Sequence, residues 1–186
     1  CQFIQKLQQT GYANISVAIN ISGHQLLRED FLTKIKNCMD EHQDCKQLLE
    51  FEITESVLFD HYEQVNDILG EVKKMGIKTS LDDFGTGFSS YSRLEELQIE
   101  NVKIDKLFID KIIEVEEKHL ILSDIISMSH KMGLQVIAEG VESEEQVVYL
   151  RKHHCDMIQG YHLSRPLFDD QALDFLRGFN KDKETN

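Results

Sequence analysis

The chain has 186 residues, of which 41% are hydrophobic, and it carries 20 Lys and Arg against 33 Asp and Glu. At roughly 150 residues per domain this length predicts one compact domain, and apolar residues spread along the whole chain exclude a disordered protein. The net charge of −13 argues against binding of DNA, RNA or an anionic membrane through surface charge alone, so a polyanionic ligand would need a local cation, which we expect to be a metal.

Short β-branched runs alternate along the chain with longer amphipathic stretches, after an opening helix predicted over Gln2–Gln9. The runs that predict strands are Ile15–Ile21, Leu48–Ile53, Ile77–Leu81, Val102–Ile104, Gln135–Ala138 and Met157–Ile158. The stretches that predict helices are Leu26–Cys38, Tyr62–Met75, Ser90–Leu97, Leu120–Met132 and Glu144–Lys152. This order favours parallel strands in right-handed βαβ units and therefore an α/β fold.

Local signals set several of these boundaries. Gly76 and Gly133 directly follow predicted helices, where a left-handed C-terminal cap is expected, and the Ser143-x-x-Gln146 spacing predicts a capping box. We expect the domain to cover residues 1–179 and the polar residues 180–186 to form a frayed tail.

The cysteines and the lack of an apolar segment bear on the compartment. No run approaches the roughly 18 apolar residues of a membrane-spanning helix, and no signal-peptide pattern follows Cys1. The four cysteines form no C-x-x-C pair, which predicts reduced thiols in a cytoplasmic protein or in the cytoplasmic part of a larger one. The run His153–Cys155 could be a metal-binding tract, but a turn between a helix and a strand is the better interpretation.

Each predicted strand carries a polar or ionisable side chain at or near its C-terminal end. In chain order these residues are Asn20, Glu52 and Glu55, Asp82 and Asp83, Lys103 and Asp105, Glu139, and Gln159. Each alone has an ordinary explanation, such as a solvated loop or a helix cap. Six strands in succession indicate one shared site, because buried carboxylates are costly unless they are paired or bound to metal.

The participation of every strand indicates the type of sheet. In a closed (β/α) barrel, groups from many strands meet at the C-terminal rim, whereas an open doubly wound sheet gathers them at one switch point. We therefore predict a TIM-like barrel. Its β/α units average about 28 residues between Asn20 and Gln159. Two more such units would bring the chain close to the roughly 250 residues of a complete eight-stranded barrel. Six of the eight strands are thus expected here, with the N-terminal two missing.

The acidic residues at the rim suit a particular class of metal. Glu52, Asp82 and Asp83 offer hard oxygen ligands and Asn20 adds a carbonyl, a set that favours Mg²⁺ or Mn²⁺, with two ions expected to activate water and hold a phosphate. Lys103 would offset phosphate charge or position the water. A lyase that uses this lysine as a Schiff-base nucleophile is disfavoured, because the carboxylates would keep it protonated.

The glycine-containing loop over residues 83–90 follows the paired aspartates. It is either a turn that cradles a phosphate or a mobile loop that reports whether the site is occupied. No Gly-Lys-Ser/Thr follows it, so it is not a Walker loop.

Together these segments resemble the EAL-domain phosphodiesterases, which hydrolyse cyclic di-GMP. The matching segments, in order along essentially the whole chain, are Asn20–Ser22, Glu52–Ser56, Asp82–Ser90, Lys103–Asp105, Ala138–Glu142, Gln159–Tyr161 and Ser164–Pro166. The resemblance implies a barrel with one antiparallel strand that cleaves one phosphodiester to give linear pGpG.

The resemblance also implies roles for individual residues. The metal ligands would be Asn20, Glu52, Asp82 and Asp83. Lys103 and Asp105 would lie beside the metals and the hydrolytic water, Glu139 would act as base or position the water, and Gln159 would contact the substrate in the same site. Glu55 would anchor the loop that contains Gly85, Thr86 and Gly87, and that loop would link the site to a homodimer interface.

One family feature is absent: the Glu-Ala-Leu triplet, whose glutamate is a metal ligand, does not occur in the chain. We expect it in the missing N-terminal quarter, so this piece alone would be weakly active at best and its cut edge would need covering. A non-catalytic cyclic di-GMP receptor or scaffold is the alternative function. A sensory or GGDEF-type module is a possible upstream partner.

Overall fold

The computed structural model describes residues 1–85, 91–114 and 120–184. Within this part of the chain one sheet of six strands has the order β1-β2-β3-β4-β5-β6. The strands are β1 (Val17–Asn20), β2 (Leu49–Thr54), β3 (Lys78–Phe84), β4 (Asn101–Ile104), β5 (Gln135–Glu139) and β6 (Met157–Gln159). All five pairings are parallel, so the antiparallel strand implied by the family resemblance is not among these six.

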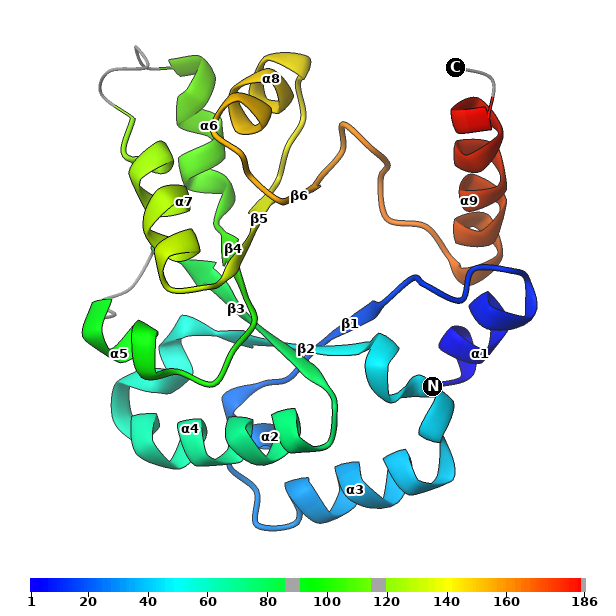
Figure 1. Ribbon diagram of the computed structural model, residues 1–186, viewed down its shortest axis with the longest axis vertical. Helices are drawn as coiled ribbons and strands as arrows, with labels where there is room; N and C mark the ends of the chain where they lie inside the picture. The colour runs from blue at the N-terminus through cyan, green and yellow to red at the C-terminus, as the bar shows by residue number, and fades with distance from the viewer. Residues whose placement is uncertain (86–90, 115–119, 185–186) are drawn as a thin grey trace.

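The sheet curls into a half-barrel with helices along its outer side (Figure 1). This confirms the predicted α/β, TIM-like architecture. The helices are α1 (Gln2–Gln9), α2 (Gly23–Leu26), α3 (Phe31–Glu41), α4 (Leu58–Lys74), α5 (Tyr91–Glu96), α6 (Lys106–Glu114), α7 (Leu122–Lys131), α8 (Glu144–Lys152) and α9 (Asp169–Glu184), with short 3-10 turns η1 (Gln43–Leu48) and η2 (Glu55–Val57).

One predicted helix needs correction, and two helices were not predicted. The stretch Leu26–Cys38 is two helices, because the capping box of Ser22 starts α2 early and a second helix begins at Phe31. The helices α6 and α9 were missed; only Asp105 separates α6 from β4, so no loop marks its start. Helix α9 extends to Glu184, and the fraying expected of residues 180–186 stays a prediction.

Other local predictions are confirmed. Gly76 and Gly133 have the left-handed φ values of 85° and 77° that their cap positions require. Ser143 and Gln146 form the capping box that starts α8. All four cysteines are free thiols, and residues 153–155 form the turn between α8 and β6. None of the described helices combines the length and apolar character needed to cross a membrane.

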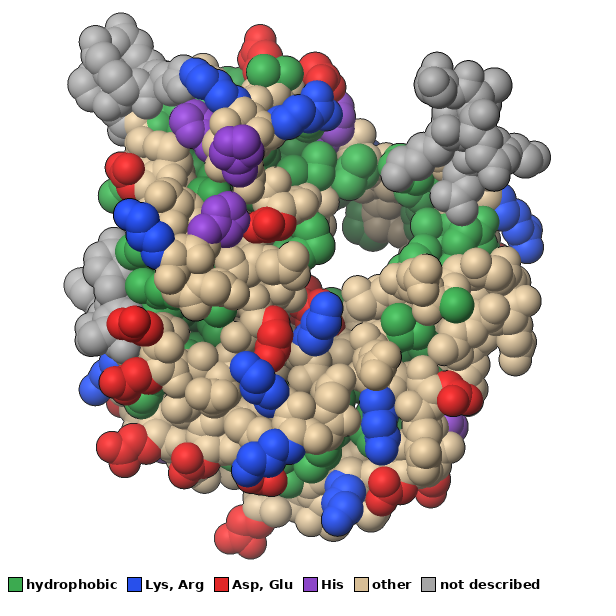
Figure 2. All heavy atoms as spheres, viewed as in Figure 1, with side chains coloured by type: hydrophobic (Ala, Val, Ile, Leu, Met, Phe, Trp, Pro, Cys, Tyr) green, Lys and Arg blue, Asp and Glu red, His purple; other side chains and the backbone are tan. Residues whose placement is uncertain are grey.

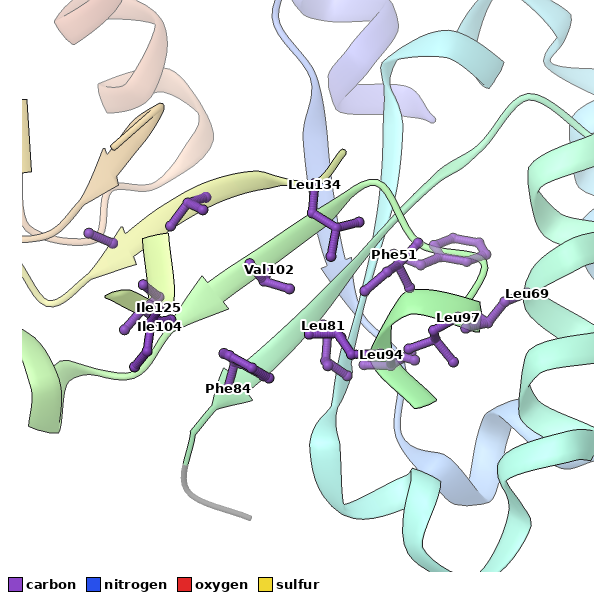
Figure 3. Close-up of a cluster of buried hydrophobic side chains, with 14 of the residues drawn as sticks. Phe51, Leu69, Leu81, Phe84, Leu94, Leu97, Val102, Ile104, Ile125 and Leu134 are labelled. Atoms are coloured by element: carbon purple, nitrogen blue, oxygen red, sulfur yellow. The ribbon is translucent and has the colours of Figure 1, made fainter. Parts of the chain in front are cut away.

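The hydrophobic core lies between the sheet and the outer helices. Figure 3 shows Phe51 of β2 and Leu81 of β3 together with Leu94 and Leu97 of the α5 region, and Leu69 of α4 beside them. All five are buried. Because side chains alternate between the two faces of a strand, the intervening residues of β2, β3 and β4 point to the inner, concave face. That face holds the polar residues.

Candidate active site

Lys103 lies at the centre of an ionic cluster on the inner face of the sheet. Its side chain is 2% exposed, and its Nζ atom lies 2.8 Å from Glu52 Oε1, 3.3 Å from Asp82 Oδ1 and 2.6 Å from Glu139 Oε1. These four residues, called the ionic cluster below, come from four consecutive strands, β2 to β5. The structure thus brings together side chains that lie up to 87 positions apart in the sequence.

The ion pairs set the charge states in this cluster. Burial disfavours the charged lysine, but the contacts of Lys103 with Glu139 and Glu52 outweigh that effect and hold its pKa above the ordinary value. Burial raises the pKa of Glu139, and Lys103 partly offsets the rise. An amine that stays protonated is no nucleophile, so the structure argues against the Schiff-base lyase.

Asp83 completes an acidic group at the edge of the ionic cluster. Its backbone is left-handed, with φ 56°, and its N–H donates to Asp82 Oδ1 at 3.0 Å. Burial and the neighbouring carboxylates of Asp82 and Asp105 raise the pKa of Asp83. Oxygen atoms of Asp82, Asp83 and Glu139 all lie within 4.8 Å of one another, and no other such acidic, histidine or cysteine group occurs in the described ranges. Several oxygens at this spacing suit a hard divalent cation.

The remaining rim residues lie at the ends of neighbouring strands. Asn20 pairs in register with Glu52, and Gln159 pairs in register with Glu139, so both flank the ionic cluster. Both side chains are exposed. Asp105 follows β4 directly, and its Oδ1 accepts a hydrogen bond of 2.7 Å from a backbone N–H in the first turn of α6. In Figure 2 the molecule is hollowed near its centre, and acidic and basic side chains lie beside the hollow.

Glu55 lies beneath the start of the loop that follows β3. Its side chain is buried, and its Oε2 accepts a hydrogen bond of 3.3 Å from the Gly85 N–H. Gly85 has φ 96°, and a Cβ atom there would lie 2.7 Å from Phe108 of α6, so only glycine fits. The contact agrees with an anchoring role for Glu55. The predicted loop residues Thr86 and Gly87 lie outside the described residues.

Sequence reasoning missed a second group of polar residues in the sheet. Glu50, Ser80 and Asn101 are buried on β2, β3 and β4 and hydrogen-bond to one another. One signal was available: in β2 two glutamates, Glu50 and Glu52, alternate with apolar residues, which places both on the same face.

Three features of the arrangement define its possible chemistry. The site offers carboxylate oxygens for divalent cations, one buried ammonium group that can face an anion, and a rim open to solvent. Cations bound by several carboxylates, with a lysine beside them, are suited to activating water and stabilising a phosphoryl group.

Comparison with known proteins identifies one family of domains. The model of the EAL domain family matches residues 1–166. The signalling protein YkoW of Bacillus subtilis is 41% identical over 95% of this chain, and the cyclic di-GMP phosphodiesterase NbdA of Pseudomonas aeruginosa is 34% identical over 98% of it. The chain spans only 22% and 23% of these two relatives.

Solved structures give the same family. The PaMucR phosphodiesterase in complex with c-di-GMP superposes with a TM-score of 0.86 at 31% identity, covering 92% of this chain and 70% of that one. Klebsiella pneumoniae BlrP1, in complex with manganese and cyclic di-GMP, superposes with a TM-score of 0.77 at 25% identity, covering 90% of this chain and 43% of that one.

Proposed function

The chain belongs to the EAL-domain family, and on that basis we propose that it hydrolyses cyclic di-GMP to linear pGpG as a metal-dependent phosphodiesterase. The observation that supports this most directly is the convergence of the oxygens of Asp82, Asp83 and Glu139 within 4.8 Å, next to the buried ammonium of Lys103. A phosphodiester is an anion that resists attack, and this combination supplies both a cation site and a fixed positive charge.

The residues present fit a divalent cation by donor chemistry. We propose Asn20, Glu52, Asp82 and Asp83 as ligands of Mg²⁺ or Mn²⁺, with two ions as the expected number. Such ions would supply water activation and charge neutralisation at the phosphate. The structure adds one alternative to this set, because Glu139, and not Glu52, lies in the group of converging oxygens.

The chain's own residues then divide the remaining tasks. Lys103 holds the carboxylates in place and faces the phosphate, and Asp105 lies close enough to Asp83 to orient the same region. Glu139 accepts or positions the water proton, and the raised pKa of its carboxyl suits that task. Gln159, beside Glu139 on the outer strand, contacts the nucleotide.

The wider setting is also a proposal. Because the chain covers less than a quarter of YkoW and NbdA, we propose that it works as one module of a larger cytoplasmic or membrane-anchored protein, together with a sensory or GGDEF-type module. We further propose a homodimer, coupled to the site through the loop that Glu55 contacts. Light scattering of the protein with and without cyclic di-GMP tests that assembly.

The test of the activity uses the full-length protein and cyclic di-GMP as substrate. We expect pGpG to form with Mg²⁺ or Mn²⁺ and not with EDTA, and Glu52→Ala to abolish turnover. Glu41→Ala is the matched control, since it removes an exposed glutamate of α3. Metal-independent turnover, or full activity of Glu52→Ala, contradicts the proposal. Calorimetric binding of cyclic di-GMP in Ca²⁺ with no turnover in any metal indicates the alternative, a non-catalytic receptor.

A further inference from the structure

A second polar layer lies directly beneath the ionic cluster. On β2, β3 and β4, the residue two positions before each member of the ionic cluster is also polar; these residues are Glu50, Ser80 and Asn101, called the lower triad below. Since residues i and i+2 of a strand point to the same side, the lower triad faces the barrel interior one step below the site.

Hydrogen bonds join the lower triad across three strands. Ser80 Oγ donates to Glu50 Oε1, and Asn101 Nδ2 donates to the same oxygen at 2.7 Å and to Ser80 Oγ at 3.1 Å. All three side chains are buried. A single carboxylate oxygen on β2 therefore ties β3 and β4 to it, at a fixed distance and in a fixed direction.

Stability is a poor explanation for these residues. No ion pair involving Glu50 occurs in the described part of the chain, and Asn101 Oδ1 is buried without a hydrogen-bond partner there. Parallel strands that are covered by helices normally consist of apolar residues, which leave no buried polar atom without a hydrogen-bond partner. A buried polar network that lowers stability is instead a candidate for specifying one geometry.

The backbone pairing of β3 with β4 does not fix the positions of Asp82 and Asp83. The β3–β4 ladder is regular at Ser80↔Asn101 and Leu81↔Val102, and its register then shifts between Leu81 and Phe84. Asp82 and Asp83 lie in the shifted segment, so ladder hydrogen bonds do not hold them against β4. The lower triad lies at the last regular pairs before the shift.

We propose that Glu50, Ser80 and Asn101 are positioning residues that fix the spacing of Glu52, Asp82 and Lys103 and thereby set the affinity of the site for its divalent cation. The proposal rests on the proposed function. It assigns the lower triad no contact with metal or substrate; the effect passes along the strands from each residue to the one two positions ahead.

The test separates positioning from stability by making the layer apolar. The full-length triple variant Glu50→Leu/Ser80→Ala/Asn101→Leu should keep or raise its melting temperature in EDTA, because apolar packing replaces a buried polar network at no loss of stability. Its Mn²⁺ affinity, measured by calorimetry, should fall roughly 10- to 100-fold, the usual effect of removing groups that orient metal ligands. Turnover at saturating Mn²⁺ should also fall, with KM for cyclic di-GMP little changed.

Three further variants keep the test decisive. Thr79→Val removes a buried hydroxyl from the opposite face of β3 and should leave Mn²⁺ affinity unchanged. Glu50→Gln keeps the shape and one acceptor oxygen and should recover most of the affinity. Ser80→Ala should bind Mn²⁺ more weakly than the wild type and serves if the triple variant does not fold. An unchanged Mn²⁺ affinity in the folded triple variant, or in Ser80→Ala where the triple variant is unfolded, overturns the inference alone. A wild-type protein that neither binds Mn²⁺ nor cleaves the dinucleotide overturns the proposed function and the inference together.

Discussion

Replacing Lys103 by methionine tests the electrostatics of the site most directly. The substitution keeps a long, flexible side chain but removes the ammonium that pairs with Glu52, Asp82 and Glu139. The side chain of Lys103 is 2% exposed, and its three carboxylate partners are 12%, 14% and 18% exposed. Water therefore cannot solvate these carboxylates well once the ammonium is gone. Breaking a buried ion pair from one side typically costs about 3–5 kcal/mol.

That cost gives a measurable shift in melting temperature. For a protein of this size, each kcal/mol corresponds to about 2–4 °C, so Lys103→Met should melt roughly 6–20 °C lower in EDTA. A divalent cation held by the proposed ligands would bind only the folded state and supply the missing positive charge, so Mn²⁺ should restore most of the loss. The assay is thermal unfolding of both proteins, with EDTA and with Mn²⁺.

The pH dependence of the loss has a definite sign. Burial already raises the pKa of Glu139 in the wild type, and Lys103→Met removes the ammonium that partly offsets this rise. An ionised carboxylate whose pKa is raised in the folded state costs stability, so the difference between variant and wild type should shrink as pH falls and Glu139 becomes protonated.

A matched control and a clear contrary result complete the experiment. Lys34→Met removes an exposed lysine that pairs with Asp30 on the surface, and its melting temperature should match the wild type. A Lys103→Met protein that melts within about 2 °C of wild type in EDTA, or one that Mn²⁺ fails to rescue, refutes the reasoning.

Three further predictions concern contacts around the site and the opposite end of the barrel. Glu55→Ala should lower kcat about 10- to 100-fold while the protein stays folded, because losing a hydrogen bond to a charged group costs about 1.5–3 kcal/mol; unchanged turnover contradicts the anchoring role. Gly85→Ala should lower the melting temperature, since φ 96° and the contact with Phe108 both exclude a Cβ atom; a Tm equal to wild type refutes this. Burial alone would raise the pKa of Asp156, but the hydrogen bonds with His130 and the Val136 N–H, together with the charge of His130, lower it, so its stabilisation is present above the ordinary value of 3.8 and is lost as pH falls below it. Asp156→Asn should therefore flatten the acid side of the stability curve, and a parallel curve would show the pair to be neutral.

The fold and the centre of the site could largely be predicted from patterns in the amino-acid sequence. Hydrophobic residues that recur every two positions locate the strands, and those that recur about every 3.6 positions locate most helices. The carboxyl ends of parallel strands lie at one rim of the barrel, which predicts that Glu52, Asp82, Lys103 and Glu139 meet. The ion pairs of Lys103 agree with that reasoning. The helices α6 and α9 were missed; the nine residues of α6 give little periodicity.

The sequence gives a signal for Glu50 alone; the hydrogen bonding of the lower triad could not be predicted, because it depends on which strands pair. In sequence, Ser80 and Asn101 are ordinary polar residues next to apolar ones, and only strand pairing shows that both reach the same oxygen of Glu50. Likewise, the register shift in β3–β4 depends on which residues lie opposite each other. The left-handed backbone of Asp83 has no signal at all, since aspartate marks turns as often as sites.

The imbalance of charge around Lys103 has a consequence for the order of events. Among the described residues one ammonium faces three carboxylates, with Asp83 beside them, so this group of side chains carries a net negative charge. A dinucleotide with two phosphates is repelled by such a group, whereas a divalent cation is attracted to it. For the proposed phosphodiesterase this predicts that the cation binds before the nucleotide, so that the metal concentration would limit turnover.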